Sequence, residues 1–499
     1  MDFSTFLNKY KEKLSHLFSK NSASNERTLN RGFEGPEHDQ IMELVPLKAF
    51  IPTQFGGFGG HTAEALAMLE ASSYESLPLA LMMGINGALF TQPVARFGDE
   101  VAKNKVLKSI AMDKKMGGLM ITEPDFGSDA LKMQTSSLIG KGDGHYHVHG
   151  TKHWAGLTGA ADYWLITARE QDQNGDLGRD ISFFIHETSN GGIEVEEYFN
   201  NLGLYMLPYG RNKIDIRVPQ THKLKPQSTG VTMMLDILHR SRLQFPGMGM
   251  GFLRRMMDEA IDHCKERFVG GQSLLNYDQV KHRISEMQAY FTVCSAMCHY
   301  TSSKISLDID TSRMDVAANA IKTVVTDFMQ KASQSLLQLT GAKGYRLDHI
   351  AGRSVVDSRP FQIFEGSNDI LYQQISESVL KNMRKVRNFN LYDYLKASEL
   401  TEQVSDRFKD SLDFDLDLKM PQRKLVALGQ AIGRIISMEF TINLEDVGFN
   451  QALIANAMAT MESEVNSIIC NFKHAEDAAI VDDYLSNSSW LALSKVNAI

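Results

Sequence analysis

Cysteine, proline and tryptophan are scarce in this sequence: its 499 residues include 4 Cys, 12 Pro and 3 Trp. Four cysteines are too few for a disulfide framework, and no Cys-x-x-Cys pair is present that could begin a zinc ribbon or a thioredoxin-like site. Cys294 and Cys298 are four residues apart. On a helix they share one face, so we expect two buried thiols in a core.

An excess of basic charge is also missing. There are 52 Lys and Arg against 60 Asp and Glu, a formal net charge of -8, whereas a nucleic-acid surface is basic. With 22% charged and 43% hydrophobic residues, the composition is that of a soluble globular protein and excludes general disorder or a collagen-like chain. Nucleic acid is therefore not an expected partner.

Long apolar runs are absent as well. No stretch approaches the roughly 18 apolar residues of a membrane-spanning helix, and the first 20 residues lack the apolar centre of a signal peptide. We therefore expect no transmembrane segment and a cytoplasmic location. Residues 3–17 place Phe, Leu and Tyr near one helical face, which predicts an amphipathic helix that docks on the body of the protein. Peripheral contact with a membrane surface is the alternative.

The segments that are present follow a helix–strand–helix order. Residues 63–73 and 100–110 have helical spacing of apolar residues. Five short segments, rich in β-branched or aromatic residues and separated by Gly or Asn-Gly turns, then predict an antiparallel sheet or small barrel. These segments are residues 145–154, 162–170, 181–186, 193–199 and 213–218.

Helical spacing returns near residue 230 and predicts a bundle of long helices. The segments are residues 233–238, 252–268, 280–307, 314–339 and 369–384, with a turn-rich stretch at 341–368. The last 120 residues contain only three of the 37 glycines. They predict an appended helical domain, with helices at 423–440, 451–472 and 475–485.

This order predicts an α+β fold and argues against an alternating βαβ fold. We divide the chain into an N-terminal helical domain (1–118), a middle antiparallel β-domain (119–229), a C-terminal four-helix bundle (230–385) and the appended helical domain (386–499).

Two motifs have an ordinary structural explanation. Gly247-Met-Gly-Met-Gly251 lacks the third spaced glycine of a dinucleotide fingerprint and predicts close helix packing instead. His145-Tyr-His-Val-His149 puts three imidazoles on one face of a strand, an arrangement that can bind zinc. No carboxylate or cysteine partner accompanies them, so we favour an exposed polar strand and no metal site. Neither a P-loop nor a nucleophile elbow is present.

A first candidate loop lies at residues 120–129, Met-Ile-Thr-Glu-Pro-Asp-Phe-Gly-Ser-Asp. Pro124 and Gly127 fix a loop in which Thr122, Ser128 and backbone N–H groups can hold a polar, planar or phosphorylated ligand. An ordinary hydrogen-bonded turn is the alternative.

A second candidate loop lies at residues 361–370, Phe-Gln-Ile-Phe-Glu-Gly-Ser-Asn-Asp-Ile. Burial beside Phe361 and Phe364 would raise the pKa of the Glu365 carboxyl. Such a base is suited to removing a weakly acidic C–H proton near neutral pH, and Gly366 would leave room for a ligand. The alternative is that the negative charge of Glu365 interacts favourably with the dipole of a helix that begins near Asn368.

Together with four further pieces, these loops resemble the acyl-CoA dehydrogenase family over about residues 45–385. The further pieces are Ile-Pro-Thr-Gln-Phe-Gly-Gly-Phe-Gly-Gly at 51–60, Gly-Thr-Lys-His-Trp-Ala-Gly at 150–156, Lys-Glu-Arg-Phe at 265–268 and Gln-Leu-Thr-Gly-Ala-Lys-Gly-Tyr at 338–345. Each piece is modest, but six in the right order argue against chance. The resemblance implies the same three-part core of helices, β-domain and four-helix bundle.

The resemblance also implies an FAD-dependent oxidoreductase in which Glu365 is the catalytic base. Glu365 would remove the pro-R α-proton of a fatty acyl-CoA thioester while the β-hydride moves to flavin N5, giving a trans-2-enoyl-CoA as in fatty-acid β-oxidation. Hydrogen bonds from the flavin ribityl hydroxyl and the Glu365 N–H would stabilise the enolate. Electrons would pass to an electron-transfer flavoprotein.

Binding residues follow from the same resemblance. The implied FAD contacts are Met120, Thr122, Ser128, Trp154, Gly156, Arg267, Gln279, Gln338, Gly341 and Ser367. The implied substrate contacts are Ser128, Arg242 and Gly366. Arg267 would reach the flavin pyrophosphate of a neighbouring subunit, in a homodimer or homotetramer. The appended domain resembles that of the extended branch acting on long chains, which can be dimeric because this domain occupies the second interface.

The sequence departs from the family pattern at several positions. Gly156 stands where many members place a threonine or serine that hydrogen-bonds flavin N5. Val356 replaces the arginine of a common Arg-Asp pair, and His239 falls near an aspartate that contacts the CoA arm. Some branches carry the base on a helix at the position of Ser241, and because serine cannot serve, Glu365 is the expected base.

Three other functions stay open. An acyl-CoA oxidase or flavin monooxygenase on the same fold would differ in oxygen access. A non-catalytic relative would act as a binding or assembly protein. The third is a metal enzyme that uses the three histidines.

Overall fold

Helix α8 (Gly230–Glu266, 37 residues) is the longest helix among the residues that the structure describes. The computed structural model describes residues 2–18, 29–32, 35–140, 142, 144–172, 174–474 and 479–490. The prediction of two separate helices at 233–238 and 252–268 is wrong, because α8 continues through Pro246. A Cβ at Gly251 would lie 2.0 Å from the Glu70 carbonyl oxygen, which confirms that the glycines allow close helix packing.

The N-terminal part is helical. Its elements are α1 (Phe3–Leu17), α3 (Pro36–Met42), η1 (Pro46–Phe50), η2 (Thr53–Phe55), α4 (Thr62–Glu75), α5 (Leu77–Gly84), the π-helix η3 (Ile85–Thr91), α6 (Gln92–Phe97) and α7 (Glu100–Asp113). Helix α1 buries Phe6, Tyr10 and Leu14, and the Tyr10 hydroxyl lies 2.8 Å from Ser72 Oγ on α4. The docking of this amphipathic helix on the body is thereby confirmed.

The middle part is a curled mixed sheet. Its strands are β1 (Gly117–Met120), β2 (Ser136–Ile139), β3 (His145–Gly156), β4 (Tyr163–Glu170), β5 (Ser182–Glu187), β6 (Ile193–Tyr198) and β7 (Tyr209–Pro219). They lie in the order β1-β4-β2-β3-β7-β6, with β5 on β4.

The five predicted strands are confirmed, but the wholly antiparallel arrangement is not. Strands β1 and β2 both run parallel to β4. These two strands have four residues each, too short for their alternation to stand out in the sequence.

The bundle consists of α8, α9 (Asp278–Lys304), α10 (Asp315–Thr340) and α12 (Asn368–Val386), and α8 contacts both α9 and α10. A small hairpin, β8 (Phe268–Val269) and β9 (Gln272–Ser273), follows α8. The stretch predicted as turns at 341–368 contains a further helix, α11 (Ile350–Ser358). Cys294 is buried and Cys298 half-buried in α9, and both are free thiols.

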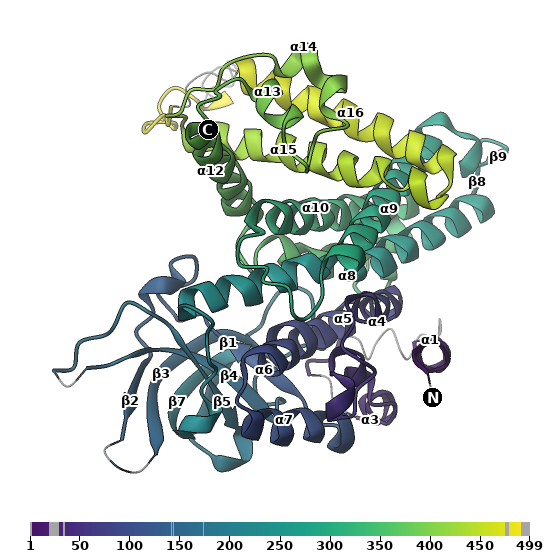
Figure 1. Cartoon of the computed structure of the whole chain (residues 1–499). Helices are drawn as coiled ribbons and strands as arrows, with labels where there is room; N and C mark the ends of the chain where they lie inside the picture. The colour runs from purple at the N-terminus through teal and green to yellow at the C-terminus, as the bar shows by residue number, and fades with distance from the viewer. Residues whose placement is uncertain are drawn as a thin grey trace, which may run out of the picture.

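The appended helices are α13 (Leu391–Lys396), α14 (Lys409–Leu412), α15 (Gln422–Ile442) and α16 (Gln451–His474). Helix α15 packs on α12, α10 and α16, and Figure 1 shows this layer on the side of the bundle away from the sheet. Of the helix predicted at 475–485, residues 475–478 lie outside the described residues. Residues 479–485 form turns and irregular chain instead of a helix.

Two helical segments, Leu77–Phe97 and Gln422–Val447, are long and apolar enough to cross a membrane. Their most apolar stretches are 100% and 72% buried inside the protein, which is typical of core helices. Apolar side chains from every part of the chain join one continuous core.

Candidate functional site

Glu365 lies in a strained turn between the short helix η9 (Arg359–Gln362) and α12. Its φ is 53° and that of Gly366 is 88°, and a left-handed backbone at a non-glycine residue costs about 1–3 kcal/mol. Two buried cations hold the turn. Arg242 donates to the Glu365 carbonyl oxygen over 3.1 and 2.7 Å, and Lys322 Nζ donates to the Gly366 carbonyl oxygen over 2.9 Å.

The Glu365 carboxyl has one paired and one unpaired oxygen. Ser241 Oγ donates to Oε1 over 3.0 Å, whereas Oε2 is buried without a hydrogen-bond partner. Burial raises the pKa of Glu365, and the nearby Arg242, Ser241 and Lys322 oppose the rise. The carboxyl thus contacts α8 and does not cap α12, whose N-cap residue is Ser367. A half-buried carboxyl with a free oxygen can accept a proton from a ligand.

Aromatic side chains form the apolar wall beside Glu365. The ring centroids of Phe361 and Phe364 are 5.0 Å apart, and those of Phe245 on α8 lie 6.0 and 6.3 Å from them. This wall is one source of the burial that raises the pKa of the carboxyl.

The ends of β3 and β7 approach Glu365 from the sheet. Burial, followed by the negative charge of Glu365, raises the pKa of Tyr209 at the start of β7. Trp154 has φ 57° and is 51% exposed where β3 bulges against β7. A Cβ at Gly156 would lie 2.8 Å from Ile85 Cδ1 and 3.3 Å from Tyr209 Cε1. Glycine at 156 therefore makes room for Ile85 of the π-helix.

The first candidate loop lies next to Trp154. Met120 ends β1, and the carbonyl oxygen of Thr122 accepts a hydrogen bond of 2.8 Å from the His153 N–H. A buried ion pair secures this contact, since Lys152 Nζ lies 3.0 Å from Glu123 Oε1. Ser128 is exposed farther along the loop.

Four other predicted residues lie far from Glu365 within one chain. Arg267 follows Arg242 by 25 residues at the end of α8, about 37 Å along a helix that rises 1.5 Å per residue. Like Arg267, the residues Gln279, Gln338 and Gly341 are exposed and lie near the ends of bundle helices. The structure does not bring these four residues to the Glu365 turn of the same chain.

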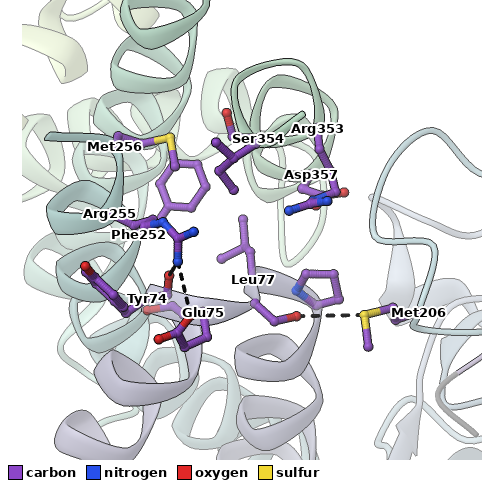
Figure 2. Close-up of a pocket in the computed structure, with 14 residues that line it drawn as sticks. Tyr74, Glu75, Leu77, Met206, Phe252, Arg255, Met256, Arg353, Ser354 and Asp357 are labelled. Carbon is purple, nitrogen blue, oxygen red and sulfur yellow. Dashed lines mark hydrogen bonds and ion pairs between the residues drawn. The ribbon is translucent and has the colours of Figure 1, made fainter. Parts of the chain in front are cut away.

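A separate small cavity lies between the α4–α5 junction, α8 and α11. Figure 2 shows Arg255 directed at Glu75, to which its Nη1 lies 3.1 Å away, and Met206 on the wall beside Ser76. Asp357 lines the same cavity, and its Oδ1 accepts a hydrogen bond of 2.6 Å from the Leu204 N–H. Burial raises the pKa of Asp357 to about 6. Asp357 therefore holds the 200–208 loop through this hydrogen bond, although Val356 stands in the place of the arginine of the Arg-Asp pair.

The remaining candidates have structural explanations. His239 is buried, its Nδ1 lies 2.9 Å from the Thr311 carbonyl oxygen, and burial lowers its pKa to about 4. Within the described ranges no group of three His, Cys, Asp or Glu side chains could hold a metal ion. His147 and His149 are exposed on β3.

Sequence reasoning missed Lys322, Lys152 and Tyr209. A signal existed for the lysines. Lys322 interrupts the apolar run Ala-Ala-Asn-Ala-Ile-Lys-Thr-Val-Val at 317–325, and Lys152 stands in the strand predicted at 145–154. A lysine that lies inside an apolar face needs a partner.

Comparison with known families gives three matches along the chain. The acyl-CoA dehydrogenase N-terminal domain matches residues 12–114, the middle domain residues 118–215 and the C-terminal domain residues 228–380. Together they span well over half of the chain.

Curated relatives and solved structures agree with this result. An acyl-CoA dehydrogenase of Bacillus subtilis (strain 168) is 25% identical over 338 residues, 66% of this chain and 86% of the relative. The human mitochondrial very long-chain specific acyl-CoA dehydrogenase is 24% identical over 373 residues. The match covers 73% of this chain and 56% of that longer protein.

Two solved structures show the same fold. A Bacillus anthracis acyl-CoA dehydrogenase complexed with FAD has a TM-score of 0.76 at 18% identity, over 95% of this chain and 89% of that one. The butyryl-CoA dehydrogenase of Megasphaera elsdenii has a TM-score of 0.66 at 21% identity, over 75% of this chain and 98% of that one.

Proposed function

This chain belongs to the acyl-CoA dehydrogenase family, and from that premise we propose that it carries out FAD-dependent α,β-dehydrogenation of a fatty acyl-CoA thioester to a trans-2-enoyl-CoA. The observation that carries the proposal is the Glu365 carboxyl, half-buried, with one oxygen bonded to Ser241 and the other buried and unpaired. Relatives named for very-long-chain, short-chain and glutaryl-CoA substrates leave chain length to experiment.

The residues around Glu365 fit a flavin. Trp154 offers a half-exposed indole at the β3 bulge, and the Thr122 segment lies beside it through the bond to His153. We propose that Thr122, Ser128, Trp154 and the backbone at Gly156 hold the flavin half of FAD. When bound, FAD supplies the acceptor for the β-hydride of the substrate.

Removal of the α-proton is carried out by residues of this chain. Ser241 holds Glu365 Oε1, so Oε2 is the oxygen that takes the α-proton. Burial raises the pKa of the carboxyl and thus brings its basicity closer to that of the substrate carbanion. Arg242 and Lys322 fix the carbonyl oxygens of the turn, and we propose that the Glu365 N–H donates to the thioester oxygen. A fixed donor at a developing enolate stabilises the transition state more than the ground state.

The rest of FAD would contact a second copy of the chain. Arg267, Gln279, Gln338 and Gly341 are exposed at the other end of the bundle, so we propose that they bind the pyrophosphate and adenosine of the partner's FAD in a homo-oligomer. An electron-transfer flavoprotein is the proposed acceptor of the electrons, and the cytoplasmic location stays a prediction.

An anaerobic titration tests the proposal. Purified protein with its flavin is mixed with saturated acyl-CoAs from short to very long, and the flavin absorbance is followed. We expect bleaching with at least one chain length and a trans-2-enoyl-CoA product. Steady hydrogen peroxide formation in air, without electron-transfer flavoprotein, would instead identify an oxidase. No bleaching with any acyl-CoA would contradict the proposed activity.

A further inference from the structure

A buried arginine of the appended helices reaches into the bundle. The Arg434 side chain on α15 is 4% exposed, and its Nη2 lies 3.0 Å from Asp327 Oδ2 on α10. Its Nε lies 3.2 Å from Glu464 Oε2 on α16, and its Nη1 donates to the Tyr372 hydroxyl. One guanidinium thus joins both appended long helices to α10 and α12.

The Asp327 carboxylate accepts hydrogen bonds on both sides of the turn that carries Glu365. Its Oδ1 accepts from Gln362 Nε2 over 2.8 Å and from Asn368 Nδ2 over 2.7 Å. Gln362 is the last residue before the 363–367 turn and Asn368 the first one after it. A single carboxylate therefore fixes both ends of the turn.

The same network continues to the carbonyl next to the base. Asn368 Oδ1 accepts from Lys322 Nζ over 2.9 Å, and Lys322 also donates to the Gly366 carbonyl oxygen. An unbroken series of hydrogen bonds therefore runs from Arg434 to the carbonyl oxygen of Gly366, the residue after Glu365. A turn with two successive left-handed residues needs such outside support, because its own backbone conformation is unfavourable.

Arg434 is the positive charge that keeps Asp327 an acceptor. Burial alone would raise the pKa of Asp327, but Arg434 and the hydrogen bonds from Tyr372 and Gln362 hold it below its usual value. The other charged groups facing Asp327 and Arg434 are Lys322 on α10 and Glu464 on α16. If the guanidinium were lost, the buried carboxylate would lose its main compensating charge and would tend to take up a proton. A protonated carboxyl cannot offer the same acceptor sites to Gln362 and Asn368.

We propose that Arg434 of the appended helical region is a positioning residue for Glu365, acting through Asp327 on the 363–367 turn. The role as a base rests on the proposed function, whereas the effect on the turn does not. The appended helices are then part of the machinery that shapes the site, beyond covering the bundle.

The test compares Arg434→Met with a matched control, Lys331→Met, in the full-length protein. Lys331 Nζ pairs with the same Glu464 at 2.5 Å but forms neither an ion pair nor a hydrogen bond with Asp327. Two quantities are measured: amide hydrogen exchange in peptides covering residues 359–371, which needs no substrate, and the pH profile of anaerobic flavin reduction. The groups that face Glu365 in that profile are Ser241, Arg242, Lys322 and Tyr209.

We expect faster exchange at residues 359–371 in Arg434→Met, with the rest of the bundle unchanged, and the native pattern in Lys331→Met. We also expect kcat to fall by roughly tenfold to a hundredfold, as misplacement of a reacting group does, with a much smaller change in KM. The acid limb of the pH profile should change shape, and Arg434→Lys should restore part of the rate.

Native exchange and a native pH profile in a folded Arg434→Met protein would overturn the proposal, and so would equal effects in Lys331→Met. If Arg434→Met does not fold, Asp327→Asn takes its place, and native exchange at 359–371 in that variant would overturn it equally. If the wild type reduces no flavin with any acyl-CoA, the proposed activity fails, while the exchange measurement still decides the role of Arg434.

Discussion

The two ends of helix α8 have opposite characters. Near its start, Ser241 and Arg242 are buried and bonded to Glu365 within the same chain. At its far end, Arg267 is exposed, about 37 Å away along the helix axis. The contrast teaches that the proton-transfer half of the proposed site is complete in one chain. Under the proposed function, the half that would bind the adenosine end of FAD would contact a ligand held by another copy.

The largest expected effect is that of removing the base. Glu365→Gln should keep its FAD but reduce it roughly 10³-fold more slowly, within the usual range for loss of general-base catalysis. The measurement is stopped-flow flavin reduction by acyl-CoA, with Glu462→Gln, a half-buried position on α16, as the control. Reduction at the wild-type rate in Glu365→Gln would show that another group takes the proton.

The next effect should appear at the other end of α8. Arg267→Ala should weaken FAD binding by roughly tenfold or more, the cost of one charge-assisted hydrogen bond. With saturating FAD the reduction rate should stay close to that of the wild type. Flavin fluorescence titration measures the affinity, with exposed Arg407→Ala as the control. Unchanged affinity together with a slow reduction rate would reverse the proposed roles of the two ends.

A smaller effect is a shift in pH dependence. Ser241 favours the ionised form of Glu365 by its hydrogen bond to Oε1, so Ser241→Ala should raise the pKa of Glu365 further. A base works when ionised, so the acid limb of the kcat profile should move to higher pH, with little change at alkaline pH. Exposed Ser303→Ala is the control. A shift to lower pH would be inconsistent with the observed hydrogen bond.

The smallest effect concerns Gly156. Gly156→Ser places a Cβ 2.8 Å from Ile85 Cδ1, and such overpacking costs about 1–3 kcal/mol. Thermal unfolding of this variant, Ile85→Val and the double variant should show that Ile85→Val relieves part of the loss. Purely additive losses would mean that Ile85 is not the obstacle at position 156.

Much of the architecture could be predicted from periodicity, whereas short and interrupted elements could not. Helices α9, α10, α15 and α16 are long enough for their apolar spacing to be clear. Strand β1 is too short for this. Pro246 inside α8 has the sequence signature of a helix end, because a proline interrupts the helical hydrogen bonds and tertiary packing keeps the helix continuous.

The site shows the same limit. Glu365, Trp154 and Arg242 could be found from motifs that are local in sequence. The apolar run around Lys322 signals a buried lysine, but its contact with Gly366 could not be predicted, because this contact depends on how α10 packs against the Glu365 turn. The unpaired Oε2 atom is likewise a property of three-dimensional packing and leaves no trace in the sequence.

The base and Arg267 of one active site are proposed to come from different copies, and mixed oligomers can separate the two contributions. Glu365→Gln and Arg267→Ala chains carrying different affinity tags are co-expressed, and oligomers that contain both are isolated by two successive affinity steps. Flavin reduction is measured at an FAD concentration that leaves the Arg267→Ala homo-oligomer largely empty. The mixed oligomer should bind FAD in half of its sites and reduce it at nearly the wild-type rate per occupied site, far above either parent. Activity no greater than the sum of the two parents, or failure of the copies to associate, would contradict the account.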